Sequence, residues 1–253
     1  MRLIKNIQEE LKNILNSPFS ISRSEKKRFN CPICLHHGPF LNVNDPTGKR
    51  EHAKCPKCSS LERHRVMWLT LETLSKNSNF GSLSLLHIAP EIQLRDLLRK
   101  KFKKYTTADL SSRKVDHKID LRNLPFADQS YDVVIACHVL EHIKEDILAL
   151  QNIRRILKPN GFAILQVPVL GKKTIEYPEP NKQEWFHVRS PGEDYFDRYL
   201  TVFGRVDRFS SSSFDPDFQP YIYENRTRWP KAYPLRPTSK GHRHEDIVPV
   251  CYP

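Results

Sequence analysis

The chain has 253 residues and a formal net charge of +12 at pH 7. This length can bury a substantial core and fits one large domain with a small module beside it. No apolar run approaches the ~18 residues that a membrane-spanning helix needs. The charged N-terminal stretch is not typical of a signal peptide, so we expect a cytoplasmic protein without a membrane span.

The positive charge is concentrated near the N-terminus. Residues 1–65 contain thirteen Lys and Arg residues against six Asp and Glu residues. Such a stretch is typical of a surface for RNA or another polyanion, and it also fits a basic surface that is simply solvated. RNA is therefore one candidate partner of the chain.

The N-terminal residues predict a helix and a linker. Apolar residues recur at helical spacing from Leu3 to Leu15, which indicates an amphipathic helix. The following residues, up to Asn30, are polar and basic and are typical of a linker. We assign the helix and linker to residues 1–28.

Four of the six cysteines form two Cys-x-x-Cys pairs separated by twenty residues. This spacing is typical of a structural zinc site, in which four thiolates close a tetrahedral shell around one ion. We therefore predict a zinc-ribbon-like module over residues 29–65. Its Zn²⁺ ligands would be Cys31, Cys34, Cys55 and Cys58.

Residues 66–253 predict a doubly wound α/β domain with a mostly parallel sheet. Ser59–Glu62 resembles a capping box that starts a helix ending near Lys76. Apolar runs then alternate with helical patterns. The expected strands lie near 83–89, 105–110, 115–121, 133–137 and 162–165, and the expected helices near 91–102 and 143–158. Ligands of such sheets bind at the carboxyl ends of the strands.

Beyond residue 169 the pattern loosens. A helix is expected over 191–203 and a strand over 205–209. Residues 210–246 are expected to be an irregular Pro-rich insertion, and residues 247–252 a final edge strand.

Four motifs of this domain form a recognisable set. They are Asp120-Leu121-x-x-Leu124-Pro125-Phe126, Tyr131–Ile135, His138–His142 and Arg155–Gly161. Together they resemble class I S-adenosylmethionine-dependent methyltransferases, in particular the methyltransferase-type-11-like group. Uncharacterised members of that group combine Cys-x-x-Cys knuckles with segments similar to Glu62–Arg65, His87–Glu91 and His187–Arg189. The resemblance implies a Rossmann-like fold and S-adenosylmethionine as cofactor, but it does not identify the methyl acceptor.

The resemblance also implies which residues hold the cofactor. Asp109 would accept both ribose hydroxyls, and Asp120 would meet the adenine amino group. Leu121 would pack on the base. Further cofactor contacts are implied at His87, Ala89, Glu91, Leu110, Cys137 and His138.

The turn after the first strand departs from the family pattern. These enzymes usually carry a glycine-rich turn there, whereas residues 82–160 contain no glycine. We expect Pro90 near the first helical position, and no need for a positive φ at Ala89. Glu91 is expected to point aside or toward the cofactor's amino group. A non-catalytic binding protein on a degenerate fold is the alternative that this departure leaves open.

The acceptor side is predicted from histidines and from residues beyond the fifth strand. His138 and His142 are candidate general bases, and they would share a face if their turn is helical. Candidate substrate contacts are His187, Arg189 and Tyr195. We expect methyl transfer to an unidentified acceptor, and a zinc-bearing methyltransferase of ribosomal RNA or tRNA is the enzymatic alternative.

Overall fold

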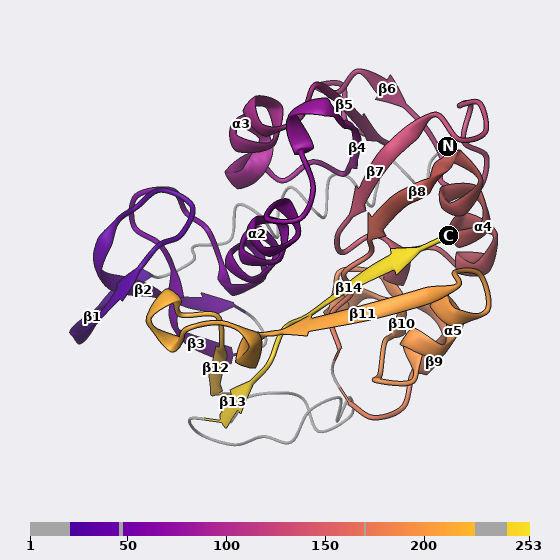
Figure 1. The fold of residues 1–253 in the computed structure, drawn as a ribbon. Helices are drawn as coiled ribbons and strands as arrows, with labels where there is room; N and C mark the ends of the chain where they lie inside the picture. Colours follow the sequence, from indigo (N-terminus) through magenta and orange to yellow (C-terminus); the bar gives the residue numbers. More distant parts are fainter. Residues whose placement is uncertain (1–20, 46–47, 170, 226–241) are drawn as a thin grey trace.

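The computed structural model describes residues 21–45, 48–169, 171–225 and 242–253, so the predicted N-terminal helix lies outside the described residues. The described chain forms a seven-stranded sheet with helices on both faces and a five-stranded antiparallel sheet beside it (Figure 1). Among these residues, no helix is both long and apolar enough to cross a membrane.

The seven-stranded sheet is doubly wound and mostly parallel, as predicted. Its order is β11 (Arg205–Ser210), β14 (Ile247–Tyr252), β8 (Leu157–Ile164), β7 (Tyr131–Ala136), β4 (Ser84–Ile88), β5 (Lys104–Asp109) and β6 (His117–Lys118). The strands from β8 to β6 are parallel, and β14 is antiparallel to both of its neighbours.

Alternating side chains of the central strands build a core on each face of this sheet. Leu85 and Val133 pack with α2 (Glu62–Ser75) and α3 (Ile92–Lys101) on one face. Leu86 and Val134 pack with α4 (Asp146–Ile156) and α5 (Tyr195–Leu200) on the other. Strands buried on both faces read as continuous apolar runs, which is why the sequence predicts them well.

Several boundaries differ from the prediction. The helix before β8 ends at Ile156, because Pro159 disfavours helical backbone in the residue before it, and Lys158 and Pro159 belong to the strand. The third parallel strand is only His117–Lys118, and α5 is only six residues long. The C-terminal strand β14 lies between β8 and β11 rather than at the edge, since its apolar side chains are buried.

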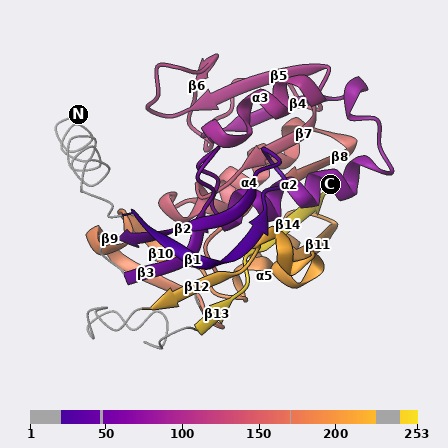
Figure 2. The same cartoon turned by 90° about the vertical axis from the view of Figure 1, so that its left-hand side faces the viewer.

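The five-stranded sheet combines distant parts of the chain. Its order is β1 (Ile21–Asn30), β2 (His37–Asp45), β3 (Gly48–Lys54), β12 (Ile222–Asn225) and β13 (His242–His244). Figure 2 shows β12 and β13 beside β3. The expected linker up to residue 28 is therefore largely strand, and the expected irregular insertion supplies two strands of the N-terminal sheet.

Short elements complete the described chain. The hairpin strands β9 (Ile175–Asn181) and β10 (His187–Ser190) form a separate two-stranded sheet. The 3₁₀ turns are η1 (Phe80–Ser82), η2 (Leu140–His142), η3 (Lys182–Glu184), η4 (Ser211–Ser213) and η5 (Pro216–Phe218).

The start of α2 joins the five-stranded sheet to the α/β domain (Figure 1). Arg65 is fully buried and donates to the carbonyl oxygens of Ala53, Ser60 and Gln219 at 2.8–3.0 Å. Glu62 pairs with Arg50 of β3 instead of closing the expected capping box. This joint fixes the N-terminal sheet against the larger domain.

Candidate functional site

The two Cys-x-x-Cys segments have the same backbone conformation. In each, the first cysteine accepts a hydrogen bond from the N–H four residues on and donates to the carbonyl five residues on, at 2.8–2.9 Å. The residues after the second cysteines, Leu35 and Ser59, have positive φ values of 59° and 62°. This repeated turn brings both thiols of each segment to one point.

The four sulfur atoms have the spacing that one tetrahedral metal ion requires. All four lie within 4.8 Å of one another, and Cys31–Cys58 and Cys34–Cys55 are each separated by 3.6 Å. Zinc–sulfur bonds of about 2.3 Å place tetrahedral sulfurs about 3.8 Å apart. The Cys55 hydrogen bond lowers the pKa of Cys31 to about 4, whereas burial raises the pKa of Cys34 to about 11. Four thiolates this close together would repel one another, so the ionisation of all four requires a neutralising cation.

The turn after β4 differs from the expected helix entry. Ala89 has a φ of +48°, and its N–H donates to the carbonyl of Ala108 at 2.8 Å. The helix α3 starts at Ile92 with Glu91 as N-cap, so Pro90 lies two residues before the first helical position. The expectations of a non-positive φ and of an immediate helix start were wrong.

Glu91 faces α2 rather than a cofactor. Its Oε1 lies 3.0 Å from Nε2 of His64 and 3.3 Å from Nε of Arg63. Nδ1 of His64 accepts a hydrogen bond from the N–H of Leu61, so Nε2 carries the proton that points at Glu91. Burial opposes ionisation, but the hydrogen bond and charge of His64, with Arg63, outweigh it and lower the pKa of Glu91 to about 2.

His87 is also a structural residue. Its side chain is fully buried, and Nδ1 lies 3.0 Å from the Tyr105 hydroxyl. Burial lowers the pKa of His87 to about 4, so the ring is neutral at pH 7. The predicted cofactor contacts of the His87 and Glu91 side chains do not fit these placements.

The end of β5 presents an accessible carboxylate and an apolar side chain. Oδ1 of Asp109 accepts hydrogen bonds from the N–H groups of Ser111 and Ser112 at 2.7 Å, which orient the carboxylate. Leu110 beside it is 62% exposed, an unusual position for a large apolar side chain. This pair offers both a hydroxyl acceptor and an apolar surface.

The segment after β6 fits its predicted role less well. Asp120 is partly exposed but pairs with Arg122 at 2.6 Å, and this hydrogen bond lowers the pKa of Asp120. Leu121 is buried in the core, so its side chain does not face the sheet edge as expected. The exposed apolar surface at this edge comes from Leu110 instead.

Cys137 and His138 at the end of β7 point in different directions. The Cys137 thiol lies 3.1 Å from the Met67 sulfur, and burial raises its pKa well above the usual range. Its side chain therefore packs under α2 and away from the sheet edge. His138 has a φ of +55° and a partly exposed ring, with Nδ1 3.4 Å from Oε1 of Glu141.

Glu141, which was not among the predicted site residues, is the centre of the histidine cluster. The following turn is 3₁₀, so His138 and His142 do not share an α-helical face. Glu141 is fully buried, and its Oε1 lies 3.9 Å from Nε2 of His187. The rings of His142 and His187 meet edge to face with centroids 4.7 Å apart. The signal in the sequence was the adjacent Glu-His pair just past a strand end.

The ionisation of the cluster is set by burial and by these contacts. Burial lowers the pKa of His187 to about 4. Burial also opposes the ionisation of Glu141, but the imidazole of His138, 3.4 Å away, outweighs it and lowers the pKa of Glu141. The cluster thus combines a buried carboxylate with a neutral imidazole at pH 7.

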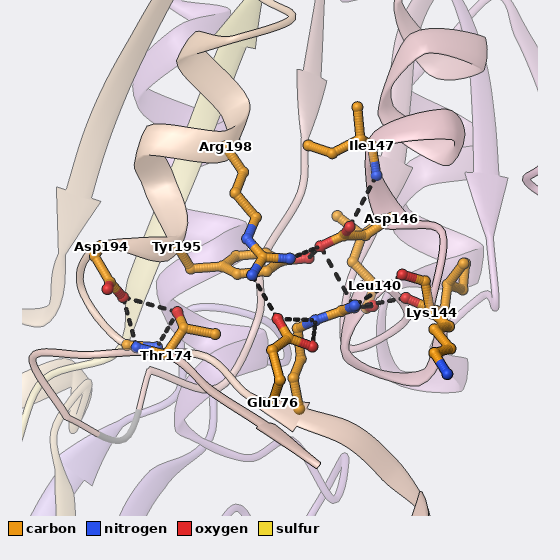
Figure 3. A network of polar contacts seen from close by, with 12 residues as sticks. Leu140, Lys144, Asp146, Ile147, Thr174, Glu176, Asp194, Tyr195 and Arg198 are labelled. Atoms are coloured by element: carbon orange, nitrogen blue, oxygen red, sulfur yellow. Dashed lines mark hydrogen bonds and ion pairs between the residues drawn. The ribbon is translucent and has the colours of Figure 1, made fainter. Parts of the chain in front are cut away.

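Arg189 and Tyr195 form a structural clamp rather than an exposed substrate contact. Arg189 is buried and donates to the carbonyl oxygens of Leu140, Ile143 and Lys144 at 2.5–3.0 Å. The Tyr195 hydroxyl donates to Asp146 at 2.8 Å. Asp146 also pairs with Arg198, and Arg198 in turn pairs with Glu176 (Figure 3). Both side chains are hydrogen-bonded to other parts of the protein, so the predicted substrate contacts of Arg189 and Tyr195 do not fit. His187 lies beside Glu141 in the histidine cluster.

Part of this sheet edge lies in a segment that matches a known protein family. Residues 91–165 match the family described as methyltransferase domain. A hybrid PKS-NRPS synthetase, poxE of Penicillium oxalicum, is 33% identical over 107 residues, which are 38% of this chain and 2% of that protein. The highly reducing polyketide synthase pkhB of Emericella nidulans is 29% identical over 126 residues, 48% of this chain and 5% of that protein. The chain thus spans at most about a twentieth of these two curated relatives.

The solved structures that the chain matches include an S-adenosylmethionine-dependent methyltransferase from Mesorhizobium loti, with a TM-score of 0.48 and 11% sequence identity. The match covers 75% of this chain and 99% of that chain.

Proposed function

Because residues 91–165 match the family described as methyltransferase domain, we propose that the chain transfers a methyl group from S-adenosylmethionine to an acceptor held at the carboxyl edge of the parallel sheet. The observation that carries the proposal is the position of Asp109 and Leu110. They lie inside the matched segment, at the sheet edge where ligands of such folds bind.

The residues at this edge fit the cofactor in part. Asp109 would hold the ribose hydroxyls, and Leu110 would cover one side of the adenine. Asp120 would take the adenine amino group once it separates from Arg122. The first amides of α3 would face the cofactor's carboxylate, as helix N-termini do for anions. Bound there, S-adenosylmethionine supplies an electrophilic methyl group on a sulfonium.

The chain's own contribution to methyl transfer is orientation and the removal of one proton. Holding acceptor and methyl donor in line supplies most of the rate that such a reaction needs. His138 and His142 are the proposed bases, because both lie at this edge and neither is fully buried.

We also propose a structural Zn²⁺ held by Cys31, Cys34, Cys55 and Cys58. The support is the sulfur spacing and the repeated knuckle conformation. The ion would hold the turns before β2 and before α2 together, and the latter turn carries the joint to the larger domain.

Methyl transfer from labelled S-adenosylmethionine into cell extracts tests the proposed function. We expect label to enter an extract component with the wild-type protein, and much less of it with Asp109→Asn when the cofactor is below saturation. Asparagine keeps an oxygen for the Ser111 and Ser112 amides while removing the charge. Ribonuclease treatment of the extract identifies an RNA acceptor, because the labelled product would then be degraded. Equal background labelling with both proteins would favour a non-catalytic binding protein.

A further inference from the structure

The carboxylate of Glu141 is buried without a hydrogen bond to either oxygen. Its side chain has no exposed surface, and neither oxygen has a hydrogen-bond partner among the described residues. A buried carboxylate without donors costs several kcal/mol. Three histidines surround it, from η2, β10 and the end of β7, yet none donates to it with hydrogen-bond geometry. This arrangement suits a cation better than it suits an ion pair.

The surrounding atoms have metal-ligand spacing. One ligand atom from each of Glu141, His142 and His187 lies within 4.8 Å of the other two. Nitrogen and oxygen ligands bound at about 2.1 Å to one ion lie up to about 4.2 Å apart. Side-chain rotations that move the ligand atoms by roughly 1 Å or less would therefore bring them into one coordination shell.

The backbone that carries the three side chains is held in place. Arg189 lies two residues after His187 and donates to the carbonyl oxygens of Leu140 and Ile143, which flank Glu141 and His142. Thus β10 is fixed against η2 by the same clamp that Figure 3 shows through Asp146 and Glu176. Ligands on segments fixed in this way are preorganised. His142 is exposed, which provides an entry path.

We propose that Glu141, His142 and His187 bind one divalent transition-metal ion, separate from the ion of the cysteine cluster. Two imidazoles and a carboxylate suit zinc, cobalt, manganese or iron, whereas magnesium prefers an all-oxygen shell. Three protein ligands leave coordination positions open. With His142 bound to the metal ion, His138 is the remaining candidate base of the proposed reaction.

The open coordination positions give the metal ion a role in methyl transfer. This role rests on the proposed function. The cluster lies just past the carboxyl end of β7, on the same sheet edge as Asp109. A cation there would coordinate an oxygen of the acceptor and hold the acceptor near the methyl donor. The proposed acceptor class is therefore a molecule that coordinates a metal through oxygen, such as one with a hydroxyl beside another oxygen.

Cobalt(II) titrated into protein that carries one equivalent of zinc, bound by the cysteine cluster, tests the site. Zinc holds the cysteine cluster more tightly than cobalt does, so added cobalt reports on other sites. We expect one equivalent of cobalt to bind by calorimetry, with a visible spectrum that lacks thiolate-to-cobalt charge transfer. Glu141→Gln and His142→Ala should each weaken binding by more than about 100-fold, beyond the effect of outer-shell changes. His142→Ala alters an exposed position and keeps the measurement available if Glu141→Gln does not fold.

The exposed residues His117 and Glu193 provide matched controls, because His117→Ala and Glu193→Gln should leave cobalt binding unchanged. The proposal would be overturned if cobalt did not bind, or if it still bound to both Glu141→Gln and His142→Ala. A thiolate charge-transfer band would also overturn it. S-adenosylmethionine binding is measured on the same samples. If the protein binds S-adenosylmethionine but not cobalt, the metal site alone is overturned. If it binds cobalt but not S-adenosylmethionine, the proposed function alone is overturned.

Discussion

Two residues at the sheet edge, Ala89 and His138, adopt a left-handed backbone although neither is glycine. A side chain in this conformation costs about 1–2 kcal/mol. The residues lie just past the ends of the adjacent strands β4 and β7, where the cofactor and acceptor are proposed to meet. Such strain concentrates at functional sites and is maintained by the surrounding structure.

Ala89→Gly is expected to stabilise the protein by about 1 kcal/mol, because glycine adopts a φ of +48° without strain. The free energy of unfolding from a denaturant titration measures the effect. Ala149→Gly in α4 is the matched control and should instead destabilise by about 1 kcal/mol. A loss of stability in Ala89→Gly would contradict the left-handed turn.

His87 is expected to make stability depend on pH. Its pKa is about 4 in the folded protein and about 6.5 when unfolded, so between these values the unfolded chain binds the extra proton. Its contribution is complete above pH 6.5 and declines as the pH falls toward 4, by about 3 kcal/mol in total.

His87→Leu removes this titration, so its unfolding free energy should fall less than that of the wild type between pH 6.5 and 4. His117→Ala, at an exposed histidine, should follow the wild type. Parallel pH curves for wild type and His87→Leu would show that His87 is not buried in its neutral form.

At the scale of elements, the parallel strands and their helices followed from local sequence, whereas the five-stranded sheet did not. Val133–Ala136 and Ala163–Ile164 are continuous apolar runs because both faces of their strands are covered. In contrast, β1 is polar and β12 is only four residues long, and β12 is stabilised by pairing with β3, about 170 residues away. Local periodicity carries no signal for such pairing.

The candidate site was predictable to a similar, limited degree. The spacing of the cysteines predicted their cluster, and the strand ends placed Asp109 and His138 at one edge. The remaining predicted site residues could not be judged from local sequence. The side chains of Arg189, Tyr195 and Glu91 form hydrogen bonds or ion pairs with residues far away in sequence. No local pattern distinguishes such residues from surface ligands.

The clamp around Arg189 should be a major source of stability for the hairpin β9–β10. Arg189→Met removes three hydrogen bonds to carbonyl groups and the ion pairs to Asp146 and Glu176. We expect a cost of about 3–5 kcal/mol in unfolding free energy, as for broken buried ion pairs. The exposed Arg113→Met should stay within about 0.5 kcal/mol of wild type. An equally small change in Arg189→Met would refute the clamp.

At the scale of the whole molecule, the cysteine cluster and the α/β domain are expected to be coupled through α2. Cys34→Ala should lose about one equivalent of zinc in metal analysis and lower the unfolding temperature. Cys251→Ala, at a buried cysteine in β14, should keep its zinc. Full zinc content in Cys34→Ala would contradict the four-cysteine site.

The most direct test of the central claim is calorimetric titration of the protein with S-adenosylmethionine. We predict saturable binding by the wild type, weakened by about 1–3 kcal/mol in Asp109→Asn through the lost charge-assisted hydrogen bonds. Asp128→Asn, at an exposed ion pair with Arg155 before the start of β7, should bind as the wild type does. No binding at millimolar cofactor, or equal binding by the Asp109→Asn variant, would contradict the account.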